Sequence, residues 1–324
     1  MSAVATVSVV IPCYRQGHFL ANAVDSVLAQ SHPAVQPIVV DDGSDDDTAE
    51  VAGRYGDRIV YVHQSNRGLP AARNAGIRVA EGRYLHFLDA DDGLHPDALA
   101  MLVEAMGGSD NRLCLMGFRS FDEDTAPDRG PVQLPPAGFS PLPGFIHHNP
   151  APPHCYLGST AMIRRAGGFD ESLRSCEDWD LWLRLAIEGV EGACLPTVGA
   201  YYRRHAASMS RNKQLMLCER ARVLLRGHER LVAKPDLYRR WGRDLAEVAH
   251  RIRRRLLAAG VPSQLVQELN VCLRDLRRDG FGGRPSFKKW LLDAVLGDLG
   301  DQLVMKYLRR FDTRAWNFYS DGIW

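Results

Sequence analysis

Apolar runs and amphipathic stretches alternate along the first 90 residues of the chain. The apolar runs are rich in β-branched residues, which is typical of strands buried on both faces; they are 7–11, 38–40, 59–62 and 84–88. The stretches between them have apolar residues at helical spacing and are 17–30, 45–55 and 70–79. Ser44 or Asp45 is expected to cap the second helix. This alternation predicts an α/β fold with a doubly wound, mainly parallel sheet.

Polar residues stand where these strands end, and in parallel sheets ligands bind beyond the carboxyl ends of the strands. The ends carry Pro12-Cys13-Tyr14, Asp41-Asp42, Asn66-Arg67 and Asp89-Ala90-Asp91. No Gly-x-Gly-x-x-Gly follows the first strand, which disfavours a dinucleotide fold of the Rossmann dehydrogenase type.

Three carboxylates, Asp89, Asp91 and Asp92, fall within four residues after the buried run 84–88. Like charges so close together repel one another, and a hard divalent cation with oxygen ligands would offset that repulsion. The alternative is an acidic, solvated turn that leads into a helix at Pro96.

The amino-acid composition changes twice in the rest of the chain. Residues 122–153 hold half of the prolines and predict a long irregular segment, which in a compact domain is functional or disordered. A strand is then predicted at 158–163, and a helix with an acidic first turn starts at Glu177. From Asn212 the chain is Arg-rich and helical, and residues 287–311 form a helix with one apolar stripe.

Composition is that of a globular protein of 324 residues, with 45% hydrophobic residues and a net charge of +1. Residues 1–212 hold 17 Lys and Arg against 26 Asp and Glu, whereas 213–324 hold 23 against 13, which indicates two modules with different partners. The seven scattered cysteines indicate a reducing compartment and buried thiols, not a disulfide framework or zinc site. We expect no signal peptide, no membrane span and no nucleic-acid partner.

Six motifs in fixed order carry a resemblance to a known family. They are Val-Ser-Val-Val-Ile-Pro-Cys-Tyr, Val-Asp-Asp-Gly-Ser, Asn-Arg-Gly-Leu-Pro-Ala-Ala-Arg-Asn, Leu-Asp-Ala-Asp-Asp, Gly-Gly-Phe-Asp-Glu and Glu-Asp-Trp-Asp-Leu-Trp. Over residues 7 to about 210 the chain resembles family 2 glycosyltransferases of the GT-A fold. The resemblance implies a metal-dependent, inverting hexosyl transfer from a nucleotide sugar, with UDP-sugar as the expected donor. The last 110 residues match no family motif.

The resemblance also implies roles for individual residues. Tyr14 would stack on the nucleobase and Asp42 would accept its ring N–H, while Asp41 supports Asp42 or the loop. The nucleotide-binding set is Pro12, Tyr14, Asp41, Asp42, Asn66, Arg73 and Asp89, with Arg67 a weaker candidate. The alternatives are helix capping for Asp41, Asp42 and Asp45, and a solvated helix face for Arg73.

The reacting groups follow from the same resemblance. Asp91, Asp89 and His205 would hold Mn²⁺ or Mg²⁺, with Asp92 as a helper or as a cap for the next helix. Asp178 would be the general base, because an acceptor hydroxyl loses its proton only to a positioned base. Glu177 would orient the acceptor; the alternative is that both carboxylates serve only the helix dipole. Arg203, Arg204 and His205 either close over the diphosphate or form a solvated loop.

Other features have simpler interpretations. His147, His148 and His154 are expected to be surface loop histidines, and Trp179 and Trp182 core residues. Residues 1–212 would be the catalytic domain, with nucleotide-sugar binding in 1–95 and the acceptor side in 96–212. Residues 213–324 would be a basic helical region.

The expected acceptor is a glycan or a lipid-linked sugar, in polysaccharide or other surface-glycan synthesis in the cytoplasm. The helix at 285–311 either contacts the inner face of the membrane or packs on other helices or in a homodimer. The competing functions are a silent nucleotide-sugar binding module and a sugar nucleotidyltransferase.

Overall fold

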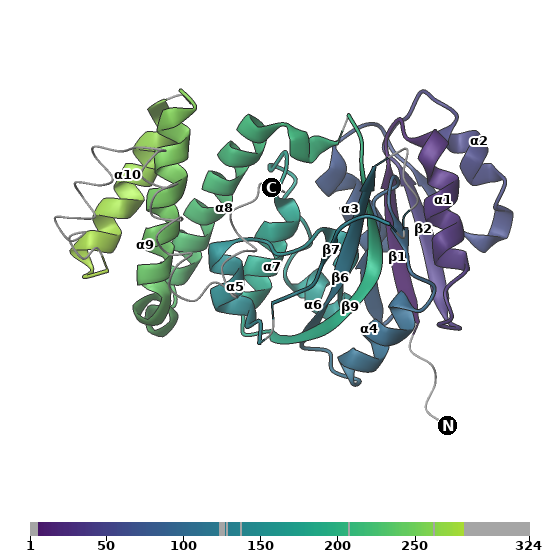
Figure 1. Cartoon of the computed structure of the whole chain (residues 1–324), viewed down its shortest axis with the longest axis horizontal. Coiled ribbons are helices and arrows are strands. Elements are labelled where there is room, and N and C mark those ends of the chain that lie inside the picture. The colour runs from purple at the N-terminus through teal and green to yellow at the C-terminus, as the bar shows by residue number, and fades with distance from the viewer. Residues whose placement is uncertain are drawn as a thin grey trace.

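The computed structural model describes residues 6–122, 127, 129–136, 138–206, 208–261 and 263–281 (Figure 1). The strands are β1 (Val7–Cys13), β2 (Val35–Asp41), β3 (Val60–His63), β4 (Tyr84–Phe87), β5 (Gly93–Leu94), β6 (Arg112–Asp122), β7 (Val132–Gln133), β8 (Tyr156–Ser159) and β9 (Glu191–Arg204). The α-helices are α1 (Gly17–Leu28), α2 (Thr48–Gly53), α3 (Leu69–Val79), α4 (Ala98–Met106), α5 (Pro141–His147), α6 (Thr160–Arg165), α7 (Glu177–Ile187), α8 (Lys213–Val232), α9 (Pro235–Ala258) and α10 (Ser263–Arg278). Three 3₁₀ turns complete these elements: η1 (Gly56–Arg58), η2 (Pro153–Cys155) and η3 (Met209–Arg211).

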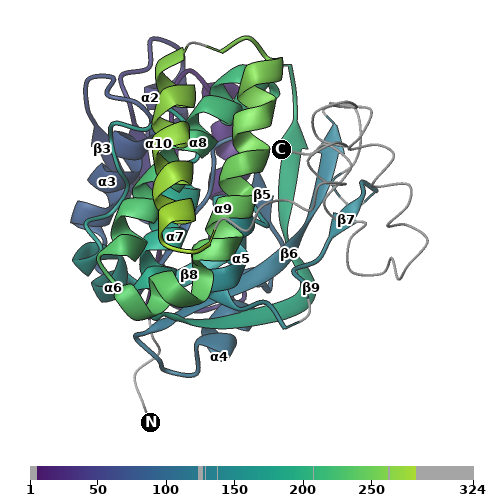
Figure 2. The ribbon, with the colours of Figure 1, turned by 90° about the vertical axis from the view of Figure 1, so that its left-hand side faces the viewer.

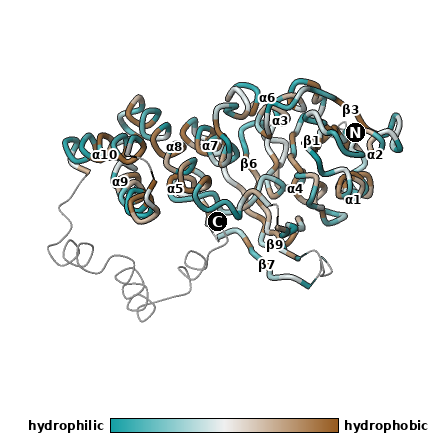
Figure 3. Tube along the Cα trace, turned by 90° about the horizontal axis from the view of Figure 1, so that it is seen from above, coloured by the Kyte–Doolittle hydropathy of each residue, from teal (hydrophilic) through white to brown (hydrophobic). Residues whose placement is uncertain are grey.

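In the part of the chain that the structure describes, all strands join one sheet in the order β3-β2-β1-β4-β8-β6-β9-β5, with β7 paired to β6. Strands β1 to β4 run parallel, as the sequence predicts. Beyond β4 the sheet is mixed, because β8 is antiparallel to both β4 and β6 while β9 is parallel to β6. Seen from above, α3 and α6 cover one face of the sheet, and α1 and α4 cover the other (Figure 3).

Several local elements differ from those predicted by the sequence. The predicted strand at 158–163 ends at Ser159, because the Ser159 hydroxyl accepts the N–H of Met162 and starts α6. Neither Ser44 nor Asp45 caps α2; the Asp46 carboxylate accepts the N–H and hydroxyl of Thr48 instead. The helix expected at Pro96 begins at Ala98. The proline-rich segment is not wholly irregular, since it contains β7, α5 and η2.

Other expectations are confirmed. Trp179 and Trp182 are buried core residues. All seven cysteines are free, and five of them are buried. The helical texture after Asn212 appears as α8, α9 and α10, while the predicted stripe at 287–311 lies outside the described residues. No helix among the described residues combines the length and the apolar character needed to cross a membrane.

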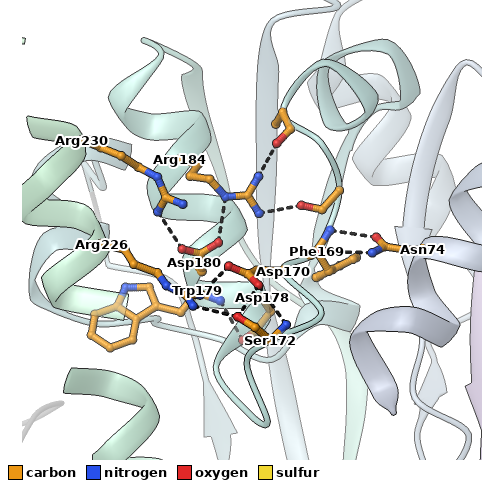
Figure 4. Close-up of polar contacts among 12 residues, drawn as sticks. Asn74, Phe169, Asp170, Ser172, Asp178, Trp179, Asp180, Arg184, Arg226 and Arg230 are labelled. Carbon is orange, nitrogen blue, oxygen red and sulfur yellow. Dashed lines mark hydrogen bonds and ion pairs between the residues drawn. The ribbon is translucent and has the colours of Figure 1, made fainter. Parts of the chain in front are cut away.

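The three C-terminal helices pack against the end of the molecule that carries α7 (Figures 1 and 2). Their apolar residues, such as Leu224 and Leu245, join the same buried cluster as the sheet. A fully buried carboxylate, Asp180 of α7, strengthens this contact (Figure 4). Its oxygens accept hydrogen bonds from Arg184 of the same helix and Arg230 of α8, each at 2.8 Å. Arg230 therefore ties α8 to α7, while Arg184 holds the same carboxylate within α7.

We expect Asp180→Ala to lower the free energy of unfolding by about 3 kcal/mol, because it leaves two cations near the interior without their partner. Urea unfolding measures the change. Asp236→Ala is the control, since the ion pair of Asp236 with Arg239 lies on the surface and such pairs contribute little. Equal losses in the two variants would contradict this role for Asp180.

Candidate active site

A cavity of about 500 Å³ opens beyond the carboxyl ends of β1 and β4 and the start of α7. Such a volume suits a small-molecule site. Ten predicted site residues line it, namely Pro12, Tyr14, Asp42, Asn66, Arg73, Asp89, Asp91, Glu177, Asp178 and His205. The parallel strands bring six of these to one edge of the sheet, Arg73 projects from α3, and α7 and the end of β9 close the opposite wall.

The end of the cavity near β1 and β2 has an aromatic side chain beside a carboxylate. Tyr14 is 42% exposed, and the guanidinium of Arg15 lies over its ring, 5.2 Å from the ring centroid. Asp42 is buried and accepts the backbone N–H groups of Arg67 and Gly68. Asp41 does not line the cavity: its oxygens accept the N–H of Ser44 and the hydroxyl of Tyr61, so it supports the loop from below. Its assignment as a direct nucleotide contact is therefore not supported.

Arg73 of α3 connects the two walls of the cavity. Its side chain is buried and pairs with Asp89 at 2.5 Å and with Glu177. Burial by itself lowers the pKa of Arg73, but Asp89, Glu177 and Asp178 outweigh it and raise that pKa. The close packing of α3 depends on Gly76, where a Cβ would lie 2.3 Å from the Val10 side chain of β1.

Asp178 is the second residue of α7 and faces the cavity. Its pKa is raised to about 7, first by burial and then by the charge of Glu177, while Arg73 opposes the rise. Cys176 precedes the helix in a left-handed conformation with φ of 59°, an uncommon one for a residue with a Cβ. This sharp entry turns the first carboxylates of α7 toward the strand ends.

Carboxylates and two histidines gather after β4. Asp91 lies 2.7 Å from the Nε2 atom of His205. Asp92 lies deeper: it accepts the backbone N–H of Arg203, and its Oδ2 atom is 3.0 Å from the Nδ1 atom of the buried His154. Burial raises the pKa of Asp92 to about 7. Burial lowers the pKa of His154, but the charge of Asp92 outweighs it and the net shift is upward.

These groups could hold a divalent cation. Ligand atoms of Asp89, Asp92 and His154 lie within 4.8 Å of one another. Asp91 and His205 line the cavity beside them. Carboxylate oxygens with one imidazole nitrogen suit Mn²⁺ or Mg²⁺, and a cation would offset the clustered negative charge, so the donor set fits.

Several sequence-based roles change with the tertiary structure. His154 is buried and belongs to the acidic cluster, so it is not a surface loop histidine. His148 is half-buried, and desolvation lowers its pKa to about 4. Glu177 is buried and paired with Arg73, which leaves it poorly placed to orient an acceptor. Arg204 pairs with Asp122 near the surface, whereas Arg203 donates to the backbone oxygen of Asp91.

The motifs in the sequence did not point to Asn149, a polar residue in contact with Asp178. Asn149 donates from its amide to the Oδ2 atom of Asp178 at 2.7 Å. An asparagine in a proline-rich stretch reads as an ordinary turn residue. Only the packing of α5 against α7 brings it to Asp178.

Comparison with known proteins gives consistent results. The family model "Glycosyl transferase family 2" matches residues 8–166. An uncharacterized glycosyltransferase of Rickettsia prowazekii is 32% identical over 189 residues, covering 55% of this chain and 58% of the relative. TuaG of Bacillus subtilis, a glycosyltransferase named for teichuronic acid biosynthesis, is 33% identical and covers 64% of this chain and 82% of the relative. WfaP of Escherichia coli, a UDP-Glc:α-D-GlcNAc-diphosphoundecaprenol β-1,3-glucosyltransferase, is 27% identical over 70% of this chain and 90% of the relative.

Solved structures share the fold at low sequence identity. TarS of S. aureus in complex with UDP-GlcNAc has a TM-score of 0.66 and 16% identity, covering 94% of this chain and 92% of that chain. The mannosyltransferase PcManGT of Pyrobaculum calidifontis, in complex with GDP-Man and Mn²⁺, has a TM-score of 0.54 and 16% identity, covering 95% and 87%. The chain spans 58% of the length of the Rickettsia prowazekii protein and 31% of the length of a Rickettsia felis relative.

Proposed function

We propose that this chain, which belongs to glycosyl transferase family 2, is an inverting hexosyltransferase that moves a sugar from a UDP-sugar to an acceptor hydroxyl. One observation carries the proposal. Arg73 pairs on one side with Asp89, at the acidic strand end, and on the other with Glu177, next to Asp178. A donor held at the strand end therefore lies within reach of Asp178, a half-buried carboxylate on the opposite wall.

The donor end of the cavity suits a uridine nucleotide. The exposed ring of Tyr14 would stack on the base, and Asp42 would accept the ring N–H of uracil. Pro12 and Asn66 complete this wall. The choice of UDP is supported by the UDP-Glc in the name of WfaP and by the UDP-GlcNAc bound to TarS.

The diphosphate would lie over the acidic cluster. Asp91, Asp89 and His205 would hold Mn²⁺ or Mg²⁺ at the cavity surface, and the Mn²⁺ bound to PcManGT supports this choice. When bound, the cation neutralises the charge that builds on the departing diphosphate. The deeper pair of Asp92 and His154 would fix the loop that carries Asp91, because Asp92 also binds the backbone of Arg203.

Asp178 would act as general base. Its pKa of about 7 suits a group that must be ionised at neutral pH and still take a proton from a hydroxyl. Attack from the wall of α7, opposite the diphosphate, inverts the anomeric carbon in one displacement. Glu177 holds Arg73 in place and does not touch the acceptor in this scheme.

The acceptor would be a glycan or a lipid-linked sugar in surface-glycan synthesis, supported by the diphosphoundecaprenol acceptor in the name of WfaP. Residues 1–212 would form the catalytic unit, and 213–324 would contribute to acceptor choice. Lipid-linked acceptors would place the enzyme in the cytoplasm at the inner face of the membrane. Residues 285–311, which would make the contact with the membrane, lie outside the described part of the chain.

Release of nucleoside diphosphate from a panel of UDP- and GDP-sugars, with and without Mn²⁺, tests the function directly. Metal-dependent release is expected with a UDP-sugar. Binding without release would favour a silent nucleotide-sugar module, and formation of a sugar nucleotide from a sugar phosphate and UTP would favour a nucleotidyltransferase.

Asp178→Asn should keep donor affinity and slow transfer on the order of 10²-fold or more, as loss of a general base does. Wild-type turnover should fall as pH drops below about 7, because protonated Asp178 cannot accept the proton. The variant should lose this pH dependence. Asp110→Asn, which alters an exposed carboxylate, is the control. Turnover of Asp178→Asn at the wild-type rate would exclude Asp178 as the base.

Asp91→Ala should abolish the Mn²⁺-dependent part of UDP binding, because it removes a cation ligand from the cavity wall. Calorimetry with and without Mn²⁺ measures this independently of turnover. Asp97→Ala removes an exposed carboxylate from the same segment and should bind like the wild type. Unchanged metal-dependent binding in Asp91→Ala would show that the cation is held elsewhere.

The product formed from an α-linked UDP-sugar should be a β-glycoside, since the scheme has a single displacement and no enzyme nucleophile. Proton NMR of the product identifies the anomer. An α-linked product would contradict the mechanism.

A further inference from the structure

We propose that Asn149 is a positioning residue for Asp178 and that Tyr156 fixes the orientation of the Asn149 amide. The two contacts form a short relay. The Tyr156 hydroxyl donates to the Oδ1 atom of Asn149 at 2.9 Å, and the Nδ2 atom of Asn149 donates to the Oδ2 atom of Asp178 at 2.7 Å. The proposal rests on the proposed function, because it takes Asp178 to be the base.

The direction of the relay follows from its chemistry. An ionised carboxylate only accepts hydrogen bonds, so Asn149 must turn its NH₂ group toward Asp178. Its carbonyl oxygen then faces Tyr156, and the phenol must donate. The other carboxylate oxygen of Asp178 accepts the N–H of Trp179 at 2.7 Å. Each oxygen thus has one fixed donor, which sets the plane of the carboxylate and leaves lone pairs for an acceptor hydroxyl.

Packing holds both ends of the relay. Tyr156, at the start of β8, is 1% exposed and stacks on Trp182 of α7 with 4.8 Å between ring centroids. Before Asn149, the indole of Trp179 donates to the backbone oxygen of Phe145 in α5 at 2.6 Å. After it, Pro150 restricts the backbone of Asn149 to extended conformations. The amide therefore has little freedom to leave Asp178.

The relay is close in the chain to residues that line the cavity and would face an acceptor bound there. Pro152 and Pro153 follow Asn149 closely in the chain and line the cavity. An acceptor that contacts Pro152 or Pro153 would therefore influence the conformation of the short backbone segment that carries Asn149. Positioning of the base and binding of the acceptor are then linked through one short stretch of chain.

Asn149 is a neutral hydrogen-bond donor to Asp178, whereas Arg73, Glu177 and Asp89 act on it through their charge. The titratable groups that face Asp178 are Glu177 and Cys176 at the start of α7, Arg73 of α3, Asp89 after β4 and Tyr156 of β8. An amide N–H favours the ionised carboxylate without adding charge. Removing it should therefore raise the pKa of Asp178 further and loosen the side chain.

Kinetics of Asn149→Ala, with and without Asp178→Asn, tests the positioning role. The assay is UDP release from the UDP-sugar that the panel identifies as donor, in the presence of Mn²⁺. Alone, Asn149→Ala should lower kcat at pH 7 on the order of 10- to 100-fold, as loss of a hydrogen bond to a charged group does, with the donor KM unchanged. The deficit should shrink as pH rises above 8, because more of Asp178 is then ionised.

In the Asp178→Asn background, Asn149→Ala should cost nothing further, because the group it positions is gone. Asn111→Ala is the matched control. The Asn111 amide donates to the backbone oxygen of Gly189, which lies beyond the end of α7, whereas Asp178 is at the start of that helix. Equal losses in both backgrounds, or a deficit that does not change with pH, would show that Asn149 only supports the fold and would overturn the proposal.

A titration without substrate separates this proposal from the proposed function. Carboxyl ¹³C NMR of Asp-labelled protein, with the Asp178 signal assigned from Asp178→Asn, should show a higher pKa for Asp178 in Asn149→Ala and no change in Asn111→Ala. Tyr156→Phe keeps the stacked ring and should raise the Asp178 pKa by less; it carries the test if Asn149→Ala does not fold. A pKa that neither variant moves would overturn the relay. A pKa that moves in a protein inactive on every nucleotide sugar would keep the relay and reject the reaction.

Discussion

A buried arginine that bridges two carboxylates is the contact on which the cavity depends. Without Arg73, Asp89 and Glu177 would face each other across a poorly solvated space, with Asp178 beside them. An uncompensated buried charge is costly, so each member of the bridge is stable only because the others are present. The bridge fixes the distance between the end of β4 and the start of α7. This distance sets the width of the cavity.

The cavity carries more negative than positive side chains. Its carboxylates are Asp42, Asp89, Asp91, Asp92, Glu177 and Asp178, and its basic partners are Arg73 and the imidazoles of His154 and His205. Two of the carboxyl groups, Asp92 and Asp178, have pKa values raised to about 7, chiefly by burial. A site with this balance favours a cation, and through the cation an anionic ligand such as a diphosphate.

The two walls are held by different means. One wall consists of the loops that follow the parallel strands. Buried carboxylates such as Asp41 and Asp42 accept hydrogen bonds from backbone N–H groups of these loops. The opposite wall is the first turn of α7, which α8 braces through Asp180 and α5 braces through Trp179 (Figure 4). The C-terminal helices therefore contribute to the position of Asp178 through their contacts with α7.

The sequence by itself determined the alternation of strands and helices in the first 90 residues, because burial on both faces of a parallel sheet requires continuous apolar runs. It also determined which residues meet at the carboxyl edge, since parallel strands all end on the same side. The motifs in order indicated the family, and the acidic strand end indicated a cation. These features depend on local pattern and on a rule of topology that holds for any sheet of this kind.

Only the tertiary structure decided the partners of the buried polar groups. The pairs of Asp92 with His154, Arg73 with Glu177 and Asn149 with Asp178 join residues separated by long stretches of chain. No spacing rule predicts such pairs, because they depend on how α5, η2 and α7 pack against α3 and the strand ends. The same is true of the mixed half of the sheet: β8 is antiparallel to β4 because of the path of the chain, and an apolar run has the same pattern in either direction.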